Sequence, residues 1–373
     1  MLLMIGEARG HVVLISEKWS EPDGHERMTR TELAQRLARI IGYEFSGEHD
    51  ASRRYGGHVY FVPDGTLLRE HSNALGIVGE CDVFGGVVPF PFVATKAITH
   101  PLVAPAAKAP AGWSHGLGAR LADATLPGYS AFGVDDARTA AARLLQHGSV
   151  RVKPANVAGG IGQAVVRSVD ELDDLFSRLD AIALDEHGVV VEQNLEKPRT
   201  YSVGTLRVAD MRISYHGTQR LTVNHHGHEV YGGSDLVVTR GAFGDLLRLD
   251  VAAPVRAAIE KAVAYDAIVA REFPGLLASR RNYDVAEGHD REGRLRCGVL
   301  EQSWRLGGAS AAEIAAIEAF MDDPDRHVVR ASTREVYSAE APPPGAKIHF
   351  RGYDASVGFL TKYSTIERNG HQS

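Results

Sequence analysis

Apolar and polar positions in residues 1–94 predict a small N-terminal α/β domain. Residues 11–16 (HVVLIS) are a short, β-branched apolar run of the kind that forms a buried strand. A helical spacing of leucine and isoleucine follows. It begins at a capping box formed by Thr29 and the glutamate three positions later, and it ends at Gly42. A second apolar run at 58–62 (HVYFV), stopped by Pro-Asp-Gly, predicts another strand.

A second compact unit is predicted over about 131–195, beyond a loop expected at 81–95 and a connector rich in proline and alanine at 105–114. Its helices are amphipathic and its strands are short and β-branched. The expected elements are a helix at 135–147, strands at 149–153 and 163–167 around a glycine-rich turn at 158–162, a helix capped by Ser168 and Glu171, and a strand at 188–192.

The rest of the chain, about 196–373, is predicted to form a larger unit around an antiparallel meander. Residues 201–240 alternate in polarity, with turns expected at Gly217 and at 224–227. A helix at 253–270 follows, then strands near 282–285 and 295–301, a helix from Ser310, capped with Glu313, to about 321, and two weak strands in the tail. We expect residues 95–373 to form one core domain, with 131–195 as its small lobe and 196–373 as its large lobe.

The composition is that of an ordinary globular protein, since 44% of the residues are hydrophobic and 24% are charged. These values exclude a collagen-like or wholly disordered chain. Lys and Arg number 41 against 47 Asp and Glu, which argues against a dedicated nucleic-acid binder. Glu7 interrupts any signal-peptide core, and no apolar run reaches the ~18 residues that span a bilayer. With only two cysteines, we expect a cytoplasmic protein without a membrane partner.

A lysine followed by a glycine-rich turn is the first candidate for binding chemistry. Lys153 ends a predicted strand, and Gly159, Gly160 and Gly162 follow it. Glycines let backbone N–H groups approach phosphate oxygens, and the lysine adds a positive charge. Taken alone, these residues are more typical of a plain glycine hairpin with a solvated lysine. A Walker loop is excluded because no GK[ST] follows and the next element is a strand.

The second candidate is the run Glu192-Gln193-Asn194-Leu195 at the end of a β-branched strand. A strand that runs into a linker exposes backbone donors and acceptors that can read the edge of an adenine. A carboxylate there can accept a hydrogen bond from the exocyclic amine. In isolation, the run is more typical of a strand end with surface polar residues.

Two carboxylates at strand ends form the third and strongest candidate. Asp284 lies in NYDV, and Glu301 ends the apolar strand CGVL. On neighbouring antiparallel strands the two can converge and hold Mg²⁺, while substrate phosphates complete its coordination shell. Ser303 and Arg305 share the face of Glu301 in an extended segment, so Arg305 can meet a phosphoryl group or a developing oxyanion. The alternative is a pair of surface acids.

These motifs, in this order, resemble the ATP-grasp superfamily, and VEQNLEKPRT resembles the hinge segment of biotin carboxylase. The matching residues are Lys96 in FVATKAITHPLV, Lys153 with GGIGQ, EQNL at 192–195, Asp284 in NYDV and the E-x-S-x-R run at 301–305. The similarity spans about 90–310. More closely, the chain resembles an uncharacterised bacterial family of ATP-grasp-like proteins. The resemblance implies an ATP-grasp fold, with residues 1–94 similar to the domain that precedes this core.

The resemblance also implies roles for these residues. ATP would lie between two α+β lobes, with Lys96 and Lys153 on its phosphates and the loop 158–162 closing over them. Glu192 and the backbone of Leu195 would contact the adenine. Asp284, Glu301 and Ser303 would bind Mg²⁺, with Mn²⁺ as an alternative ion, and Arg305 would stabilise the reacting carboxyl-phosphate group. Ser303 departs from the asparagine usual in the family, and Trp304 replaces a small residue or proline.

The leading hypothesis is an ATP- and Mg²⁺-dependent ligase. It would activate a small-molecule carboxylate as an acyl phosphate, which an amine or another nucleophile then attacks. A non-catalytic nucleotide-binding or regulatory protein is the alternative that Ser303 and Trp304 favour. A structural or protein-binding module on a degenerate fold is the third. No nucleic-acid partner is expected, and the sequence leaves open whether the protein forms a homo-oligomer.

Overall fold

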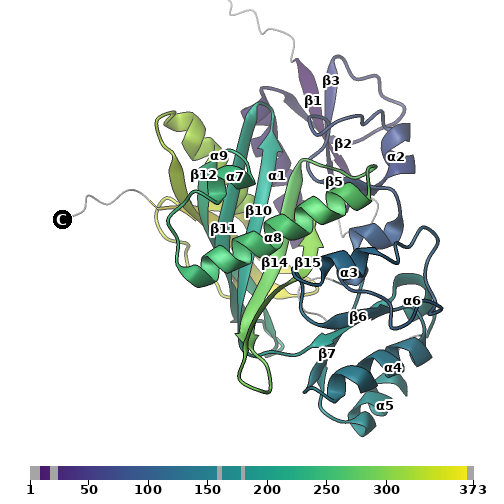
Figure 1. Ribbon diagram of the computed structural model, residues 1–373. Helices are drawn as coiled ribbons and strands as arrows, with labels where there is room; N and C mark the ends of the chain where they lie inside the picture. Colours follow the sequence, from purple (N-terminus) through teal and green to yellow (C-terminus); the bar gives the residue numbers. More distant parts are fainter. Residues whose placement is uncertain (1–8, 17–23, 158–161, 178–180, 368–373) are drawn as a thin grey trace, which may run out of the picture.

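The computed structural model describes residues 9–16, 24–157, 162–177 and 181–367. The fold is mixed α/β and α+β, as predicted, with a long antiparallel sheet at its centre and a smaller lobe beside it (Figure 1). Within the described residues, no helix combines the length and the apolar character needed to cross a membrane.

The N-terminal part is a parallel sheet with one long helix packed on it. Strand β1 (Gly10–Ile15) lies between β2 (Glu44–Glu48) and β3 (His58–Pro63), and α1 (His25–Ile41) covers them. Both predicted strands and the helix are confirmed, whereas β2 was missed because EFSGE has little apolar character. The elements that follow are β4 (Leu67–Leu68), α2 (Arg69–Ala74), β5 (Gly86–Val88), the 3₁₀ turns η1 (Pro91–Ala94) and η2 (Lys96–Thr99), and α3 (Leu117–Leu121). The loop predicted at 81–95 is therefore only partly a loop.

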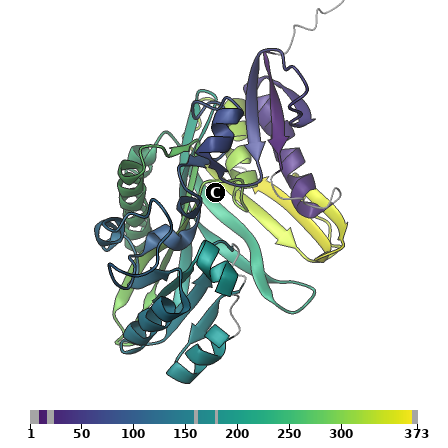
Figure 2. The ribbon, with the colours of Figure 1, turned by 90° about the vertical axis from the view of Figure 1, so that its right-hand side faces the viewer.

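The predicted start of α1 is wrong, and the reason is a contact across the fold. The helix begins at His25, so Thr29 lies inside it and caps nothing. The backbone N–H of His25 donates instead to Oδ2 of Asp354 over 2.8 Å. Figure 2 shows α1 beside the yellow C-terminal strands that carry this aspartate. The predicted end is confirmed, because Gly42 adopts a left-handed φ of 78°.

The small lobe is an antiparallel sheet with strand order β6-β9-β7-β8 and helices on one side. Its elements are β6 (Gly128–Ala131), α4 (Val134–Leu145), β7 (Val150–Pro154), β8 (Ala164–Val166), α5 (Val169–Ser177), α6 (Ala181–His187) and β9 (Val189–Gln193). The cap of α5 is confirmed, since Ser168 Oγ accepts from the N–H of Glu171 at 3.2 Å. Strand β6 and helix α6 were not predicted.

The large sheet has strand order β15-β14-β10-β11-β12-β16-β18-β17, all antiparallel. Its strands are β10 (Glu196–Val208), β11 (Met211–Val223), β12 (Glu229–Arg240), β14 (Arg280–His289), β15 (Leu295–Ser303), β16 (Val328–Val336), β17 (Lys347–Asp354) and β18 (Gly358–Ile366). Helix α8 (Ala253–Glu272), after the short α7 (Phe243–Leu246), covers one face, and α1 and α9 (Ser310–Asp322) cover part of the other. A short strand, β13 (Leu277–Ala278), pairs with β5.

Two local predictions in the large lobe are wrong. Gly217 lies inside β11 rather than in a turn, and a Cβ there would be 2.2 Å from the carbonyl oxygen of Asp235. The chain turns instead after β10, where Ala209 has a positive φ of 50°. Ser310 does not cap α9 with Glu313, because its Oγ accepts from Gly307 and the glutamate is buried in an ion pair. The turn at 224–227 is confirmed.

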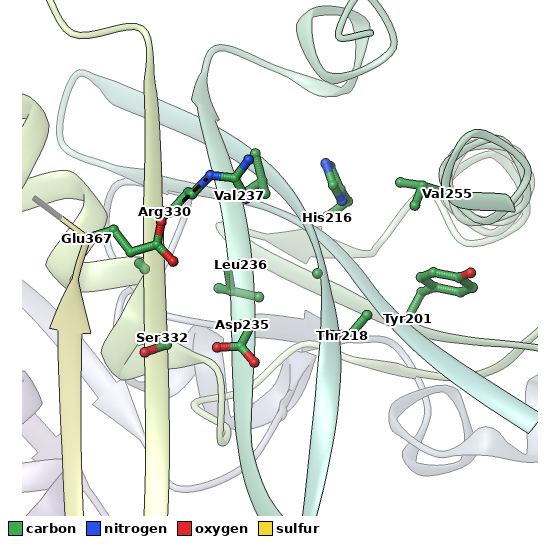
Figure 3. A pocket seen from close by; sticks show the side chains of 12 residues that line it. Tyr201, His216, Thr218, Asp235, Leu236, Val237, Val255, Arg330, Ser332 and Glu367 are labelled. Carbon is green, nitrogen blue, oxygen red and sulfur yellow. Dashed lines mark ion pairs between the residues drawn. The ribbon is translucent and has the colours of Figure 1, made fainter. Parts of the chain in front are cut away.

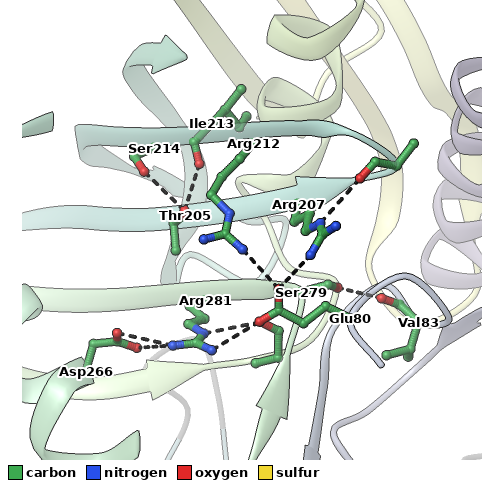
Figure 4. Close-up of polar contacts among 12 residues, drawn as sticks. Glu80, Val83, Thr205, Arg207, Arg212, Ile213, Ser214, Asp266, Ser279 and Arg281 are labelled. Atoms are coloured by element: carbon green, nitrogen blue, oxygen red, sulfur yellow. Dashed lines mark hydrogen bonds and ion pairs between the residues drawn. The ribbon is translucent and has the colours of Figure 1, made fainter. Parts of the chain in front are cut away.

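A carboxylate surrounded by guanidinium groups ties the N-terminal part to the large sheet (Figure 4). Glu80 accepts from Arg212 at 3.1 Å and from Arg281 at 3.3 Å, and Arg207 lies 3.8 Å away. In the same region Ser279, next to β14, bonds the carbonyl oxygen of Val83. Together with the β5–β13 pair, these bonds seat the segment that leads to η1 and η2 against the large sheet. The domain boundary at residues 94–95 stays a prediction.

Candidate functional site

The two acidic residues predicted to bind metal lie opposite each other. Asp284 on β14 and Glu301 on β15 are register partners across the antiparallel pair. Directly opposed residues point to the same face of a sheet, so the two carboxylates converge as the sequence analysis expected. A β-bulge between Asp284 and Val285 interrupts the ladder at this point. Ser303, two residues after Glu301, pairs with Asn282 on the same face.

Asp284 accepts hydrogen bonds from two side-chain amide groups and is repelled by the charge of Glu301. Its Oδ1 accepts from Nε2 of Gln219 at 2.8 Å and from Nδ2 of Asn282 at 3.1 Å. Burial, and then the charge of Glu301, raise the pKa of Asp284 to about 6. A bound cation would relieve this repulsion, and Mg²⁺ prefers oxygen ligands of this kind. Gln219 was not singled out from the sequence.

The described residues contain no group of three or more His, Cys, Asp or Glu side chains that could hold a metal ion. The protein therefore offers two carboxylates and neighbouring neutral oxygens rather than a complete cage. Such a donor set fits Mg²⁺, which keeps several waters and is often bound through one or two carboxylates plus substrate phosphates. It does not fit a structural zinc site, which needs four protein ligands.

Lys96 joins the carboxylate pair from the segment that leads into the small lobe. Its ammonium lies 2.8 Å from Oε2 of Glu301 and is only 4% exposed. The same group donates to the carbonyl oxygens of Pro154, at 3.4 Å, and Val157. Because Pro154 directly follows Lys153, both predicted phosphate-binding lysines lie at the end of β7.

The position of Lys96 is fixed by a glutamine on the other face of β15. Nε2 of Gln302 donates to the carbonyl oxygens of Val93, at 3.0 Å, and Thr95, at 2.6 Å. These bonds attach the η1–η2 segment directly to the strand that carries Glu301. Trp304 packs on that same face, 1% exposed, and its Nε1 donates to Tyr283. Trp304, which departs from the motif that the sequence resembles, is thus a core residue.

The second acid–base cluster is deeply buried between β7, β9 and the end of η2. Lys153 Nζ lies 2.6 Å from Oε1 of Glu192, and both side chains are at most 3% exposed. Nε2 of His100 lies 3.3 Å from the other oxygen, Oε2. Burial works to raise the pKa of Glu192, but Lys153 and His100 hold it below its ordinary value. Burial lowers the pKa of His100. This histidine was not singled out from the sequence.

The residues after Glu192 are mainly structural in their side-chain contacts. Asn194 accepts from Arg151 at 2.9 Å and donates to Ser149, and Leu195 is buried against Leu126 and Ala286. The Gln193 side chain is 8% exposed, and its Oε1 has no hydrogen-bond partner among the described residues.

Gly162 has the left-handed φ of 71° that a tight turn requires. Gly159 and Gly160 lie outside the described residues.

Arg305 follows the carboxylate strand and is largely buried. Its Nη1 donates to the carbonyl oxygen of Leu306 at 3.0 Å, and no carboxylate of the described residues forms an ion pair with it. Burial and the nearby Arg280 lower the pKa of Arg305. A guanidinium in this position attracts an anion. Arg280 holds the backbone here, since it donates to the carbonyl oxygens of Ser303 and Arg305.

Arg280 itself forms a fully buried ion pair that the sequence analysis did not identify. It bonds both oxygens of Glu313 on α9, at 2.7 and 2.8 Å. The hydroxyl of Tyr215 on β11 lies 2.6 Å from the same carboxylate and 2.8 Å from Oδ1 of Asn282. The carboxylate pair therefore stands on a polar network that links β11, β14 and α9.

A cavity of about 210 Å³ lies on the opposite face of the large sheet (Figure 3). Its lining includes His216, Thr218, Asp235, Arg330 and Ser332. Thr218 pairs with Tyr201, whereas the face of Asp284 is continued by Ser202 and Gly217. Because side chains alternate along a strand, this cavity is separated from the carboxylates by the sheet itself.

A model of a protein family, described as "Protein of unknown function (DUF3182)", matches residues 13–364. The chain belongs to this family. A comparison with curated proteins finds no match. Among solved structures, the chain is similar to a phosphoribosylamine–glycine ligase from Thermotoga maritima, with 14% identity over 95% of this chain and 91% of that chain and a TM-score of 0.47.

It is also similar to the ADP complex of an N5-carboxyaminoimidazole ribonucleotide synthetase, with 11% identity, coverage of 97% and 94%, and a TM-score of 0.45. A third structure is an ATP-grasp ligase in complex with a minimal precursor, Mg and ADP, with 16% identity, coverage of 83% and 96%, and a TM-score of 0.40.

Proposed function

We propose that the protein is an ATP- and Mg²⁺-dependent carboxylate ligase of the ATP-grasp type. One observation carries the proposal: the ion pairs Lys96–Glu301 and Lys153–Glu192 meet at the end of β7, with Asp284 beside the first. Segments separated by more than a hundred residues thus bring two ammonium groups and a carboxylate pair to one place. A nucleoside triphosphate with its metal ion matches this distribution of charge.

Nucleotide binding would exchange the partners within these pairs. Lys96 and Lys153 would turn from Glu301 and Glu192 to the phosphates. Glu192 and the backbone around Gln193, Asn194 and Leu195 would then receive the adenine. Asp284 and Glu301, with the hydroxyl of Ser303, would hold Mg²⁺ or Mn²⁺, which supplies charge neutralisation on the phosphoryl oxygens.

The reaction would proceed in two transfers. A substrate carboxylate oxygen attacks the γ-phosphorus of ATP, the bond between that phosphorus and the β,γ-bridging oxygen breaks, and ADP leaves. An amine or another nucleophile then attacks the acyl carbon, and inorganic phosphate leaves with the carbonyl restored. Arg305 would stabilise the negative charge at the acyl-phosphate stage, because its guanidinium has no carboxylate partner in the described part of the chain.

Calorimetric titration of Mg·ADP tests the binding step. We expect measurable binding to the wild type and a loss of at least about tenfold in Lys153→Met, since one charge-assisted phosphate contact disappears. Lys347→Met is the matched control, because this exposed lysine pairs with Glu318 away from the site. Absence of binding to the wild type, or equal affinity in both variants, would contradict the proposal.

A second assay tests the transfer itself. Incubation with ATP, Mg²⁺, hydroxylamine and a panel of small carboxylic acids would trap an acyl phosphate as its hydroxamate. We expect hydroxamate and ADP in equal amounts with at least one acid, and none with Arg305→Leu. Tight nucleotide binding without any hydroxamate would instead support a non-catalytic nucleotide-binding protein, the role that Ser303 favours.

A further inference from the structure

The buried imidazole beside Glu192 has no role in the site as described so far. Each oxygen of Glu192 has its own partner, Oε1 with Lys153 at 2.6 Å and Oε2 with His100 at 3.3 Å. His100 comes from the end of η2, four residues after Lys96, whereas Glu192 lies on β9. The histidine is 1% exposed. It therefore contacts the carboxylate in a dry environment, where a single hydrogen bond counts most.

The fold leaves a specific space for the His100 ring, called its seat below. Gly128 on β6 is the register partner of Glu192, and a Cβ at Gly128 would lie 2.7–2.9 Å from three atoms of the His100 imidazole. Only a glycine leaves room for the ring next to the carboxylate. The seat is fixed from the other side as well, because Ser130 Oγ donates to the carbonyl oxygen of Ala97 and Thr99 bonds Tyr265 on α8.

The charge states of the two groups define their hydrogen bond. Burial lowers the pKa of His100, and Lys153 together with His100 keeps Glu192 ionised. A neutral imidazole facing a carboxylate donates from Nε2, which leaves Nδ1 without a proton. Nδ1 is buried and has no partner among the described residues, so a second proton there would be an unsatisfied donor.

We propose that His100 is a positioning residue that holds the Glu192 carboxylate toward the nucleobase once Lys153 has turned to the phosphates. The inference rests on the proposed function. When Lys153 leaves, Oε1 becomes a free acceptor for an exocyclic amine, and the bond from His100 to Oε2 is what keeps the carboxylate oriented. His100 thereby selects a 6-amino purine over a 6-oxo purine without contacting the base.

The test compares ADP with inosine 5′-diphosphate, which has an oxo group in place of the amine, by calorimetry in the presence of Mg²⁺. We expect the wild type to prefer ADP. In His100→Leu this preference falls by about tenfold or more, because a bond to a charged group is lost. His100→Gln, which returns an N–H donor, retains the preference within about threefold.

Two further variants separate this role from a general loss of stability. His349→Leu removes another buried histidine, whose Nε2 lies 3.0 Å from Ser364 Oγ and whose Nδ1 also has no partner among the described residues. It should lower the melting temperature and leave the ratio of the two affinities unchanged. Gly128→Ala displaces the ring while His100 and Glu192 keep their identity, and it should lower the ratio even if His100→Leu does not fold.

The outcomes distinguish the two proposals. A wild type that binds neither diphosphate overturns the proposed function and this inference with it. A wild type that binds ADP, with an unchanged ADP preference in a folded His100→Leu or in Gly128→Ala, overturns the role of His100 and leaves the proposed function intact.

Discussion

The two ends of the candidate site are built on opposite electrostatic principles. One end, called the base end because we propose that it receives the nucleobase, contains Glu192 between Lys153 and His100. All three side chains there are at most 3% exposed. At the metal end, Asp284 and Glu301 face each other, Glu301 is 26% exposed, and a single ammonium compensates them. The charge of Glu192 at the base end is thus compensated without a ligand, whereas the metal end retains a like-charge repulsion. A bound cation would therefore relieve an unfavourable interaction at the metal end that has no counterpart at the base end.

Breaking the buried pair should have the largest effect on stability. Glu192→Leu leaves the Lys153 ammonium buried without a counter-charge, and we expect a loss of about 3–5 kcal/mol in the free energy of unfolding. Glu301→Leu should cost only about 0–1 kcal/mol, since Lys96 keeps two carbonyl acceptors and Asp284 loses its repulsion. Urea unfolding at pH 7 measures both, and equal losses would remove the contrast between the two ends.

The repulsion at the metal end should be visible as a pH dependence. Burial and Glu301 raise the pKa of Asp284 to about 6, above the value near 4 of an unfolded chain. The folded state therefore binds a proton more tightly than the unfolded state, so this residue lowers stability as the pH rises from about 4 to 6. Asp284→Asn should be more stable than the wild type by about 1–3 kcal/mol at pH 7.5 and nearly equal to it at pH 4.

The control for this experiment is an exposed carboxylate. Asp325→Asn changes the same group in the loop after α9, where the side chain is exposed. Its difference from the wild type should be small at both pH values. If Asp284→Asn behaved in the same way, the carboxylates would not repel each other, and the main electrostatic argument for a cation at this end would be lost.

The sequence singled out the acids and lysines of the candidate site because each is a local signal. Asp284 and Glu301 adjoin alternating or apolar runs, and Lys153 precedes a glycine run, although β14 continues beyond Asp284 to His289 and β15 beyond Glu301 to Ser303. Their convergence followed from one additional step, the pairing of neighbouring antiparallel strands. The longer helices and most strands were predicted for the same reason, since hydrophobic periodicity is a property of a short window.

The residues that the sequence missed act between distant segments. His100 reaches Glu192 across 92 positions, and Gln219 reaches Asp284 across 65. No pattern in one segment encodes such a contact. The wrong assignments have the same origin: α1 is capped by an aspartate 329 positions away, and Gly217 is a glycine because a neighbouring strand approaches it closely. A glycine in a sequence indicates a lack of space as often as it indicates a turn.

A smaller effect is expected on ADP binding without metal, and it should distinguish the charge of Glu301 from the ion pair that Glu301 forms with Lys96. In Glu301→Gln the ion pair is lost, and we expect ADP to bind about three- to tenfold more tightly in the absence of metal, because Lys96 is then free to meet phosphate. Asp284→Asn removes the same charge without releasing Lys96 and should strengthen metal-free binding less. Calorimetry with ADP in the presence of a chelator measures both, and a reversed order would contradict the proposed exchange of partners.

The smallest predicted effect concerns Ser303, where the metal end departs from the ATP-grasp motif that the sequence resembles. Its hydroxyl forms no hydrogen bond within the described residues, and it lies opposite Asn282 at the end of the strand pair. Water and phosphate oxygens complete the coordination shell of Mg²⁺. Ser303→Ala should therefore reduce the increase in ADP affinity that Mg²⁺ produces by at most about threefold. Ser303→Asn, which supplies a longer and more polar carbonyl, should strengthen it. A loss of tenfold or more in Ser303→Ala would instead make the hydroxyl an essential ligand, and the metal end would then depend on fixed protein contacts as strictly as the base end does.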